Sequence, residues 1–443
     1  MSQERSSRRR FLITSAGLGA AAFLGPTARV LGANERIGVG IIGVGGRGTE
    51  LMRLALRRSE EQGDVEIRAV CDVYQRRLTA ASERAPHAKQ YVYHQELLER
   101  PDIDAVIVAT PDHWHATITL MALEKGMDVY VEKPMTHTVE EATKVFHKAR
   151  EKERALQVGV QALSWSKWHK AKDAIAKEML GKIVCCQGTY SRNVVGGDWN
   201  YYEIDASAGP DAAGENHIEW KQWLGPAPER PYDPDRFFRF RKYWDYSGGI
   251  ATDLHYHTVA PFHVAVANDF PVRVVGMGGI WIHKDGREVP DTFLTAADYP
   301  SQYSLTVQSS AANQVGPRTL IRGERATMYC GADWEGETYD HLRIVPEEPF
   351  KKEFIEKWRK EEILISDTEN EGDMKHMDNF FDCVHSRKQP NCNVDIGYKV
   401  MVAIGLSVRS CREGKMFFFD PERERVATRQ LRVSRERVSG RAG

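Results

Sequence analysis

The sequence predicts an α/β fold that begins with a doubly wound parallel sheet of the Rossmann type and continues into a second domain. A short apolar run at residues 37–42 leads directly into a glycine-rich turn, and strand and helix patterns alternate from residue 34 to about 160. The length of 443 residues exceeds the roughly 250–300 residues that one core usually holds. We therefore expect residues 34–160 to form the Rossmann domain and residues 161–420 to form a second domain.

The first 33 residues are expected to be an export signal and not part of the fold. The motif SRRRFL precedes an apolar segment from Ile13 to Leu24, and small residues at Leu31–Ala33 are suited to cleavage. This order is typical of a signal peptide, and the S-R-R-x-F-L form resembles the twin-arginine export signal. The apolar run is too short to span a bilayer. A periplasmic or secreted protein with no stable membrane anchor is expected.

Charge and cysteine content exclude several classes of protein. The chain has 61 basic and 62 acidic residues and a net charge of −1, so no electrostatic field would recruit nucleic acid or an anionic membrane. The seven cysteines are scattered, with Cys185 and Cys186 adjacent. This spacing fits neither a disulfide framework nor a C-x-x-C metal site. Buried free thiols are expected instead.

A predicted strand at Ile37–Ile42 leads into a G-x-G-x-x-G turn and then into a helix over Thr49–Arg58. The first glycine permits the tight turn, the second lets a pyrophosphate approach the backbone, and the third lets helix and strand pack closely. The helix N-terminus supplies N–H donors for the phosphates. The pattern predicts a site for NAD, with NADP possible, and its first contacts are Gly43, Gly45, Gly46, Arg47 and Gly48.

Asp72 follows the next predicted strand, Val65–Val70. A carboxylate at this position typically binds the adenosine ribose hydroxyls and repels a 2′-phosphate, which favours NAD. Arg76 and Arg77 follow closely and are suited to a phosphate, so NADP remains open. A helix N-cap is the alternative role for Asp72.

Two further predicted strands, Asp104–Ala109 and Asp128–Val131, each end in polar residues. Because the carboxyl ends of parallel strands form the ligand edge of such a sheet, these residues are expected beside the cofactor. Pro134 favours an extended conformation at Lys133, which would direct the ammonium group over the crevice. A solvated surface charge is the alternative for Lys133. The predicted cofactor contacts at this edge are Thr110, Pro111, His113, Trp114, His115, Glu132 and Lys133.

The order GVGGRG, Asp72, TPDHWHA and VEKP resembles the Gfo/Idh/MocA oxidoreductases, and within them the secreted twin-arginine bacterial branch. The resemblance runs from about Arg36 to Asp420. It implies a nicotinamide cofactor, sugar-like or polyol-like substrates, and a C-terminal α+β domain with a large, mostly antiparallel sheet. It further implies a homo-oligomer, a dimer or tetramer, formed through that sheet. It also implies that Lys133 is catalytic.

Residues 191–245 are long, irregular and rich in aromatic residues, and a long ordered loop in a compact domain is usually functional. Stacking on sugar faces is one role for these rings, and packing of the loop onto the domain is favoured for any single one. Trp220 and Trp223 are expected to be structural. The other expected elements are a strand at Ile183–Tyr190, a sheet over Phe270–Met328, loops over Asp333–Glu371, helices at Met374–Val384 and Gly397–Cys411, and a flexible tail at residues 421–443.

A second chemical centre is predicted in the stretch SGGIATDLHYH. If it is helical from Ile250, Asp253 and His257 are neighbours at i and i+4, and the carboxylate can orient the imidazole as a general base. The stretch also resembles the family signature G-G-G-x-x-x-D-x-G-x-H, which implies that both residues act with Lys133. The chain departs from it by placing His255 where the family has glycine. Substrate contacts are therefore assigned to Lys133, His255 and His257, with polar packing as the alternative for the two histidines. No metal is predicted because H-x-H lacks a clear third ligand.

The predicted reaction is hydride transfer between a carbinol carbon of a sugar, glycoside or polyol and a nicotinamide ring. Because little free dinucleotide is expected outside the cytoplasm, the cofactor is expected to be bound tightly and regenerated in the same site. One alternative is redox-assisted glycoside hydrolysis or elimination, as in the NAD-dependent α-N-acetylgalactosaminidases that this chain resembles. A second alternative is a non-catalytic secreted sugar-binding module.

Overall fold

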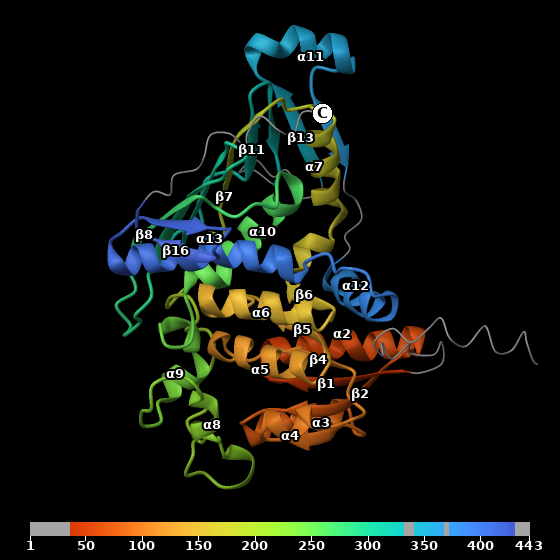
Figure 1. Ribbon diagram of the computed structural model, residues 1–443. Coiled ribbons are helices and arrows are strands. Elements are labelled where there is room, and N and C mark those ends of the chain that lie inside the picture. Colours follow the sequence, from red (N-terminus) through yellow and green to blue (C-terminus); the bar gives the residue numbers. More distant parts are fainter. Residues whose placement is uncertain (1–35, 332–340, 367–371, 430–443) are drawn as a thin grey trace, which may run out of the picture. The chain divides into compact units, whose positions relative to one another are not determined.

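Two β-sheets organise residues 36–331, 341–366 and 372–429, the part of the chain that the computed structural model describes (Figure 1). The predicted export signal at residues 1–33 lies outside the described residues. The first sheet has six parallel strands in the order β3-β2-β1-β4-β5-β6. The second has ten strands in the order β14-β13-β12-β11-β7-β10-β9-β8-β15-β16, and it is mostly antiparallel, with β10 parallel to β7. The predicted fold class is confirmed.

The first sheet is doubly wound, and its buried strands β1 and β4 are apolar throughout, as expected of strands covered by helices on both faces. Helix α5 begins at Asp112, so His113 and His115 lie in its first turn and not in a preceding loop. The strands are β1 Ile37–Ile42, β2 Val65–Cys71, β3 Lys89–Tyr91, β4 Ala105–Val108, β5 Asp128–Glu132 and β6 Leu156–Gly159. The helices are α2 Gly46–Gln62, α3 Gln75–Arg84, α4 His94–Leu98, α5 Asp112–Glu124 and α6 Val139–Glu151.

The second sheet alternates buried and half-buried positions, as in β9 Thr292–Asp298, because one of its faces packs on helices. Helix α13 Val394–Glu413 crosses β8 Arg273–Gly279 closely enough that a Cβ at Gly276 would lie 1.9 Å from the carbonyl oxygen of Ser407. The other strands are β7 Ile183–Gly188, β10 Ser304–Ser310, β11 Leu320–Gly323, β12 Ala326–Tyr329, β13 His341–Pro346, β14 Ile363–Ser366, β15 Phe417–Asp420 and β16 Arg425–Ala427. Outside residues 199–246, the other α-helices after residue 160 are α7 Ser166–Ala176, α10 Tyr256–Ala265, α11 Lys351–Trp358 and α12 Gly372–Ser386.

Three strands lie where loops or a tail were expected. Strands β13 and β14, with α11 between them, occupy much of the predicted loop region 333–371. Strand β16, placed in the predicted tail, pairs with β15. Sheet edges tolerate charged side chains, so charge in these stretches did not exclude strands.

Residues 199–246, here called the cover segment, contain the short helices α8 Trp220–Leu224 and α9 Pro234–Phe238. Trp220 and Trp223 stack at a centroid distance of 4.8 Å and belong to a buried cluster, which confirms their structural role. The same cluster includes Tyr74 from the Rossmann half. The cover segment therefore packs on the nucleotide-binding half of the chain.

The seven cysteines are free, as predicted, and Cys185 and Cys411 are half-buried while the others are buried. Among the helices that the structure describes, none has both the length and the apolarity needed to cross a bilayer.

Candidate active site

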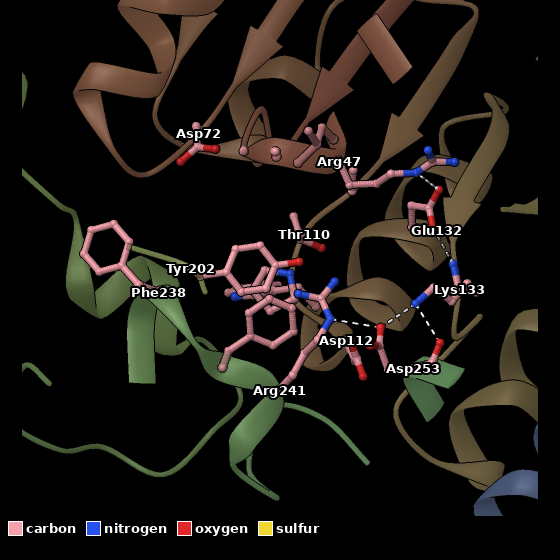
Figure 2. A pocket seen from close by; sticks show the side chains of 18 of the residues that line it. Arg47, Asp72, Thr110, Asp112, Glu132, Lys133, Tyr202, Phe238, Arg241 and Asp253 are labelled. Carbon is pink, nitrogen blue, oxygen red and sulfur yellow. Dashed lines mark hydrogen bonds and ion pairs between the residues drawn. The ribbon is translucent and has the colours of Figure 1, made fainter. Parts of the chain in front are cut away.

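A cavity of about 560 Å³ runs along the carboxyl ends of the first sheet, where doubly wound folds bind ligands. Its size lies within the usual range for small-molecule sites, about 300–1,000 Å³. Figure 2 shows the Rossmann half on one side and the cover segment on the other. The predicted site residues that line it are Gly43, Gly45, Gly46, Arg47, Asp72, Thr110, Pro111, Trp114, Glu132, Lys133, Asp253 and His257.

The glycines of the turn differ in what the structure requires of them. Gly43 has a φ of +87°, which side-chain-bearing residues rarely adopt. A Cβ at Gly48 would lie 1.8 Å from the carbonyl oxygen of Gly43, so this glycine lets α2 pack on the strand end without lining the cavity. Gly45 has an ordinary φ of −68° and room for a Cβ, with Arg77 nearest at 3.4 Å. The fold itself therefore does not require glycine at residue 45.

Asp72 joins the end of β2 to the glycine turn. Its carboxylate accepts hydrogen bonds from the backbone N–H of Val44 at 2.9 Å and of Tyr74 at 3.0 Å. Arg77 lies 3.9 Å from this carboxylate and also lines the cavity, whereas Arg76 bonds to residues of the cover segment. Asp72 thus caps backbone N–H groups on both sides of the cavity edge and also lines the cavity, together with Arg77.

The residues present fit a dinucleotide. Helix α2 begins at the cavity with Gly45 as N-cap and no side-chain cap, so its N-terminal N–H groups are available to a phosphate. The hydroxyl oxygen of Thr110 is buried at the cavity and has no partner among the described residues. An unpaired buried hydroxyl is unfavourable unless a ligand satisfies it. These two features, together with the open space at Gly45, are what an elongated phosphate-bearing ligand needs.

Arg47 and Glu132 form a fixed pair beside the cavity. Arg47 Nε donates to Glu132 Oε1 at 2.7 Å, and its Nη1 donates to Asp373 of α12 at 2.8 Å. Burial alone would raise the pKa of Glu132, but the charges of Arg47 and Lys133 hold it below its usual value. The second oxygen of Glu132 accepts the backbone N–H of Lys133 at 3.1 Å. Glu132 thus fixes the backbone that carries Lys133.

The histidines of the TPDHWHA stretch do not reach the cavity, which corrects two predicted cofactor contacts. His113 is 3% exposed and lies 3.0 Å from the carbonyl oxygen of Trp223, which also accepts the indole N–H of Trp114 at 2.8 Å. His115 is 1% exposed and lies between the carbonyl oxygens of Thr110, at 2.9 Å, and Pro134, at 2.6 Å. Helix α5 starts earlier than expected, and its first turn directs both imidazoles into the interior. There they lie within hydrogen-bond distance of backbone carbonyl oxygens and link separate segments of the chain.

Lys133 and Asp253 meet across the two halves of the chain. Lys133 Nζ donates to Asp253 Oδ1 at 2.5 Å and to the carbonyl oxygen of Asp253 at 3.0 Å (Figure 2). The same carboxylate accepts Arg241 Nε at 3.0 Å and Trp199 Nε1 at 3.1 Å, and Arg192 lies 3.5 Å away. Burial alone would raise the pKa of Asp253, but the charges of Lys133 and Arg241 hold it well below its usual range. Asp253 is therefore a permanent anion that holds Lys133 in place.

His257 lines the cavity, but it is not oriented by Asp253 as predicted. The residues Ala251–His255 form a π-helical turn before α10, and both carboxylate oxygens of Asp253 bind the cationic and indole donors. No hydrogen bond to a protein group is found for His257 within the described ranges, and its ring lies 5.8 Å from that of Tyr190. Loss of surrounding water lowers the pKa of His257 to about 3, and the nearby charge of Lys133 acts in the same direction. His257 is consequently a neutral imidazole in this structure, and the charges of Asp253 and Glu132 oppose part of the lowering of its pKa.

His255, a predicted substrate contact, lies away from the cavity. It is 0% exposed, and its Nδ1 lies 3.0 Å from the hydroxyl oxygen of Thr295 on β9. Burial lowers the pKa of His255 to about 3. The imidazole fills space between the helix and the second sheet, so it packs internally and does not contact substrate. No cluster of three or more metal-ligating side chains occurs in the part of the chain that the structure describes.

One family model matches the Rossmann domain, and a second matches the first part of the domain that follows it. Residues 37–160 match the NAD-binding Rossmann domain of the Gfo/Idh/MocA oxidoreductases, and residues 166–279 match the family's C-terminal α/β domain. The chain belongs to the Gfo/Idh/MocA family. Its first half is accordingly an NAD-binding Rossmann domain.

Curated relatives match this chain over only part of their length. An α-N-acetylgalactosaminidase of Shewanella oneidensis is 36% identical over 124 residues, which are 26% of this chain and 26% of that protein. A glycosyl hydrolase family 109 protein of Shewanella baltica is 28% identical over 180 residues, 39% of this chain and 38% of that protein. The chain thus matches between about a quarter and two-fifths of these relatives.

Solved structures match this chain over most of their length. A levoglucosan dehydrogenase in complex with NADH and levoglucosan has a TM-score of 0.63 at 16% identity, covering 86% of this chain and 99% of that one. The WlbA dehydrogenase of Bordetella pertussis, in complex with NADH and UDP-GlcNAcA, has a TM-score of 0.62 at 18% identity, covering 87% and 99%. At these identities the likeness concerns the fold.

Sequence reasoning missed three residues that surround the Lys133–Asp253 pair. They are Trp199, Arg192 and Arg241, all from the irregular region after β7. No spacing rule links them to residue 253, because they reach it through the folding of a long loop. The many aromatic and arginine residues of that loop were the signal in the sequence that could have indicated its contact with the site.

Proposed function

We propose that this Gfo/Idh/MocA chain is an NAD(P)-dependent oxidoreductase that acts on a CH–OH group of a sugar, glycoside or polyol. The observation that carries the proposal is that Lys133, Asp253 and His257 line the same cavity as the glycine turn. A phosphate-binding turn and a set of proton-handling groups in one cavity are the two parts that such a reaction needs. The sugar ligands named for the two solved dehydrogenases support this substrate class.

The chain's own residues manage the substrate hydroxyl. A bound nicotinamide would supply the hydride acceptor. His257 is an imidazole that burial keeps neutral near pH 7, and it accepts the hydroxyl proton on a ring nitrogen. The negative charge of Asp253, which acts to raise the pKa of His257, stabilises the protonated ring. Lys133 has three N–H donors, two of which bind Asp253. The third donates to the reacting oxygen and stabilises its developing negative charge.

NAD is the proposed cofactor, with NADP as the second choice. The Asp72 carboxylate at the end of β2 favours ribose hydroxyls over a 2′-phosphate. Arg77, which lines the same part of the cavity, is the residue that would favour NADP.

Two further properties are proposed with this function. The twin-arginine motif supports export of the folded protein to the periplasm or beyond, with a tightly bound cofactor recycled in the site. A homo-oligomer formed through the ten-stranded sheet is proposed from the family resemblance.

Redox-assisted glycoside cleavage is the second candidate reaction. The partial matches to α-N-acetylgalactosaminidase and to glycosyl hydrolase family 109 proteins favour it. It would use the same cavity, since transient oxidation also needs the cofactor, Lys133 and His257. A non-catalytic sugar-binding module is the remaining alternative.

Native mass spectrometry and product analysis test these proposals together. We expect purified protein to carry NAD and to convert members of a sugar and glycoside panel. Oxidised products such as 3-keto sugars support the oxidoreductase, whereas hydrolysed glycosides support redox-assisted cleavage. We expect Lys133→Ala and His257→Ala each to lose about 10²–10⁴-fold in turnover while cofactor stays bound. Near-full turnover of both variants would refute the assigned mechanism, and an empty, inactive protein would favour the binding module.

A further inference from the structure

The active-site cavity opens to solvent beside His257, and tyrosine side chains lie at this opening. Tyr190 and Tyr201 both line the cavity, yet they are 44% and 46% exposed. Side chains that line a cavity and remain nearly half exposed lie where it opens. The ring of Tyr190 lies 5.8 Å from that of His257, so the opening adjoins the reacting centre.

Tyr190 and Arg192 follow β7 in a segment that is still bonded to β10. The backbone N–H of Arg192 donates to the carbonyl oxygen of Ser310 at 2.9 Å. The backbone N–H of Tyr190 donates to the hydroxyl oxygen of Ser309 at 2.9 Å. Because successive side chains of an extended chain alternate in direction, residues 190 and 192 share one face, and both line the cavity. The sheet therefore fixes an aromatic ring and a guanidinium group side by side at the opening.

A buried carboxylate holds Arg192 without using all of its donors. Arg192 Nε donates to Asp198 Oδ2 at 2.7 Å, and Asp198 is 0% exposed. Arg192 Nη2 lies 3.5 Å from Asp253 Oδ2, which is longer than an ordinary hydrogen bond. The outer N–H groups of a guanidinium fixed in this way are available to the oxygen atoms of a ligand.

Tyr201 approaches the same guanidinium from the cover segment. Its ring packs on that of Tyr202 at a centroid distance of 4.6 Å. Burial and the neighbouring Tyr202 raise the pKa of Tyr201, and the charge of Arg192 opposes this rise, so the Tyr201 hydroxyl lies near the guanidinium. Tyr190, Arg192 and Tyr201, here called the mouth group, thus come from two segments and surround one opening.

The charges around the mouth group cancel within the protein. Figure 2 shows Asp112, Lys133, Arg241 and Asp253 gathered at this end of the cavity. The cations are matched in number by carboxylates, which are Lys133, Arg192 and Arg241 against Asp112, Asp198 and Asp253. A charged ligand would remain unbalanced here. The site therefore suits a neutral ligand that has oxygen acceptors and apolar C–H faces.

We propose that the mouth group binds a second sugar ring, next to the ring that is oxidised, so that the substrate is a neutral disaccharide or longer glycoside. The inference rests on the proposed function and specifies its substrate. The tyrosine rings cover the C–H faces of this second ring, because such stacking removes apolar surface from water. Arg192 donates to its hydroxyl groups. A monosaccharide would reach Lys133 and His257 and leave the mouth group uncovered.

Pairs of sugars with a common ring test the proposal on the protein with NAD bound. The pairs are lactose with methyl β-galactoside, cellobiose with methyl β-glucoside, and maltose with methyl α-glucoside. Calorimetric titration measures affinity, and the fluorescence of bound NADH after rapid mixing reports oxidation separately. For the pair that binds best, we expect the disaccharide to bind at least about tenfold more tightly than the methyl glycoside. The aldonic acid of that disaccharide, whose second ring is opened and acidic, should lose this advantage.

Substitutions in the mouth group identify the residues responsible. Tyr201→Ala should bring the affinities of the two sugars within about threefold of each other, whereas Tyr201→Phe keeps the ring and should retain the difference. Tyr190→Leu, which keeps an apolar side chain without an aromatic face, is the second variant and should also reduce the difference. Tyr93→Ala is the matched control, because Tyr93 is 41% exposed and does not line the cavity. It should leave the difference as it is in the wild type.

Equal affinities of disaccharide and methyl glycoside in the wild type would overturn the inference alone, as would a difference that survives both Tyr201→Ala and Tyr190→Leu. An aldonic acid that binds more tightly than its disaccharide would overturn the neutral character of the ligand. Preferred binding of disaccharides without any reduction of bound NAD would overturn the proposed function alone. Absence of binding for every sugar would overturn both.

Discussion

Adding one methyl group at two glycines of the turn separates what the fold requires from what the cofactor requires. Gly48→Ala places a Cβ 1.8 Å from the carbonyl oxygen of Gly43, a backbone atom that cannot rotate away. Gly45→Ala places a Cβ beside only the flexible end of Arg77, at 3.4 Å, in a backbone conformation that alanine adopts readily. The first variant should therefore damage the fold and the second only the ligand site.

The size of each effect follows from these contacts. To restore an ordinary C···O distance of about 3.3 Å, α2 must move from β1 by roughly 1.5 Å at Gly48. Overpacking of this kind costs about 1–3 kcal/mol, and the same shift displaces the N–H donors that face the phosphates. Gly45→Ala should change the free energy of unfolding by less than about 0.5 kcal/mol. It should weaken cofactor binding by about tenfold or more, equal to about 1.4 kcal/mol, because the methyl group occupies the path of the pyrophosphate.

Denaturant unfolding of the cofactor-free chain and calorimetric titration with NAD measure the two quantities independently. Gly46→Ala, whose Cβ would meet no atom within 4 Å, is the stability control for a methyl group in this turn. A Gly48→Ala variant as stable as the wild type would refute the packing argument. Unchanged NAD affinity in Gly45→Ala would refute the placement of the pyrophosphate.

Three further predictions concern buried side chains. Trp199→Phe removes the 3.1 Å hydrogen bond to Asp253 Oδ2 and should lower kcat several-fold with little change in KM, measured by steady-state kinetics. An unchanged kcat would show that Asp253 needs no indole partner. His255→Gln should lower the free energy of unfolding by about 1–2 kcal/mol and leave KM within about threefold, because His255 bonds Thr295 away from the cavity; a large rise in KM would restore it as a substrate contact. Burial lowers the pKa of His376 from 6.5 to about 4, so its contribution to stability is complete above pH 6.5 and is lost as pH falls toward 4. Lowering the pH from 7 to 5.5 should therefore reduce the free energy of unfolding by about 1 kcal/mol through His376. If the thermal midpoint of His376→Asn depends on pH as strongly as that of the wild type, His376 is not the group responsible.

The Rossmann half was predictable because its signals are local. The strand Ile37–Ile42 was placed with the bounds that the structure has. An apolar run, a glycine turn and an acidic residue after the next strand are short-range patterns, and each reflects a steric or electrostatic need of the turn itself. The structural role of Trp220 and Trp223 was also predicted correctly, because a loop rich in aromatic residues is expected to be ordered.

The sequence by itself determined the doubly wound sheet, the dinucleotide turn and the presence of Lys133, Asp253 and His257 in one site. Only the tertiary structure decided that Asp253 pairs with Lys133 and not with His257. Asp253 binds Lys133, which is 120 positions away in the chain, together with Arg241 and Trp199, and no local pattern encodes such a choice. The π-helical turn at Ala251–His255 and the packing of the cover segment place these donors around the Asp253 carboxylate. Several side chains far apart in the sequence could bind a buried carboxylate, and only the folded backbone determines which of them lie within hydrogen-bond distance.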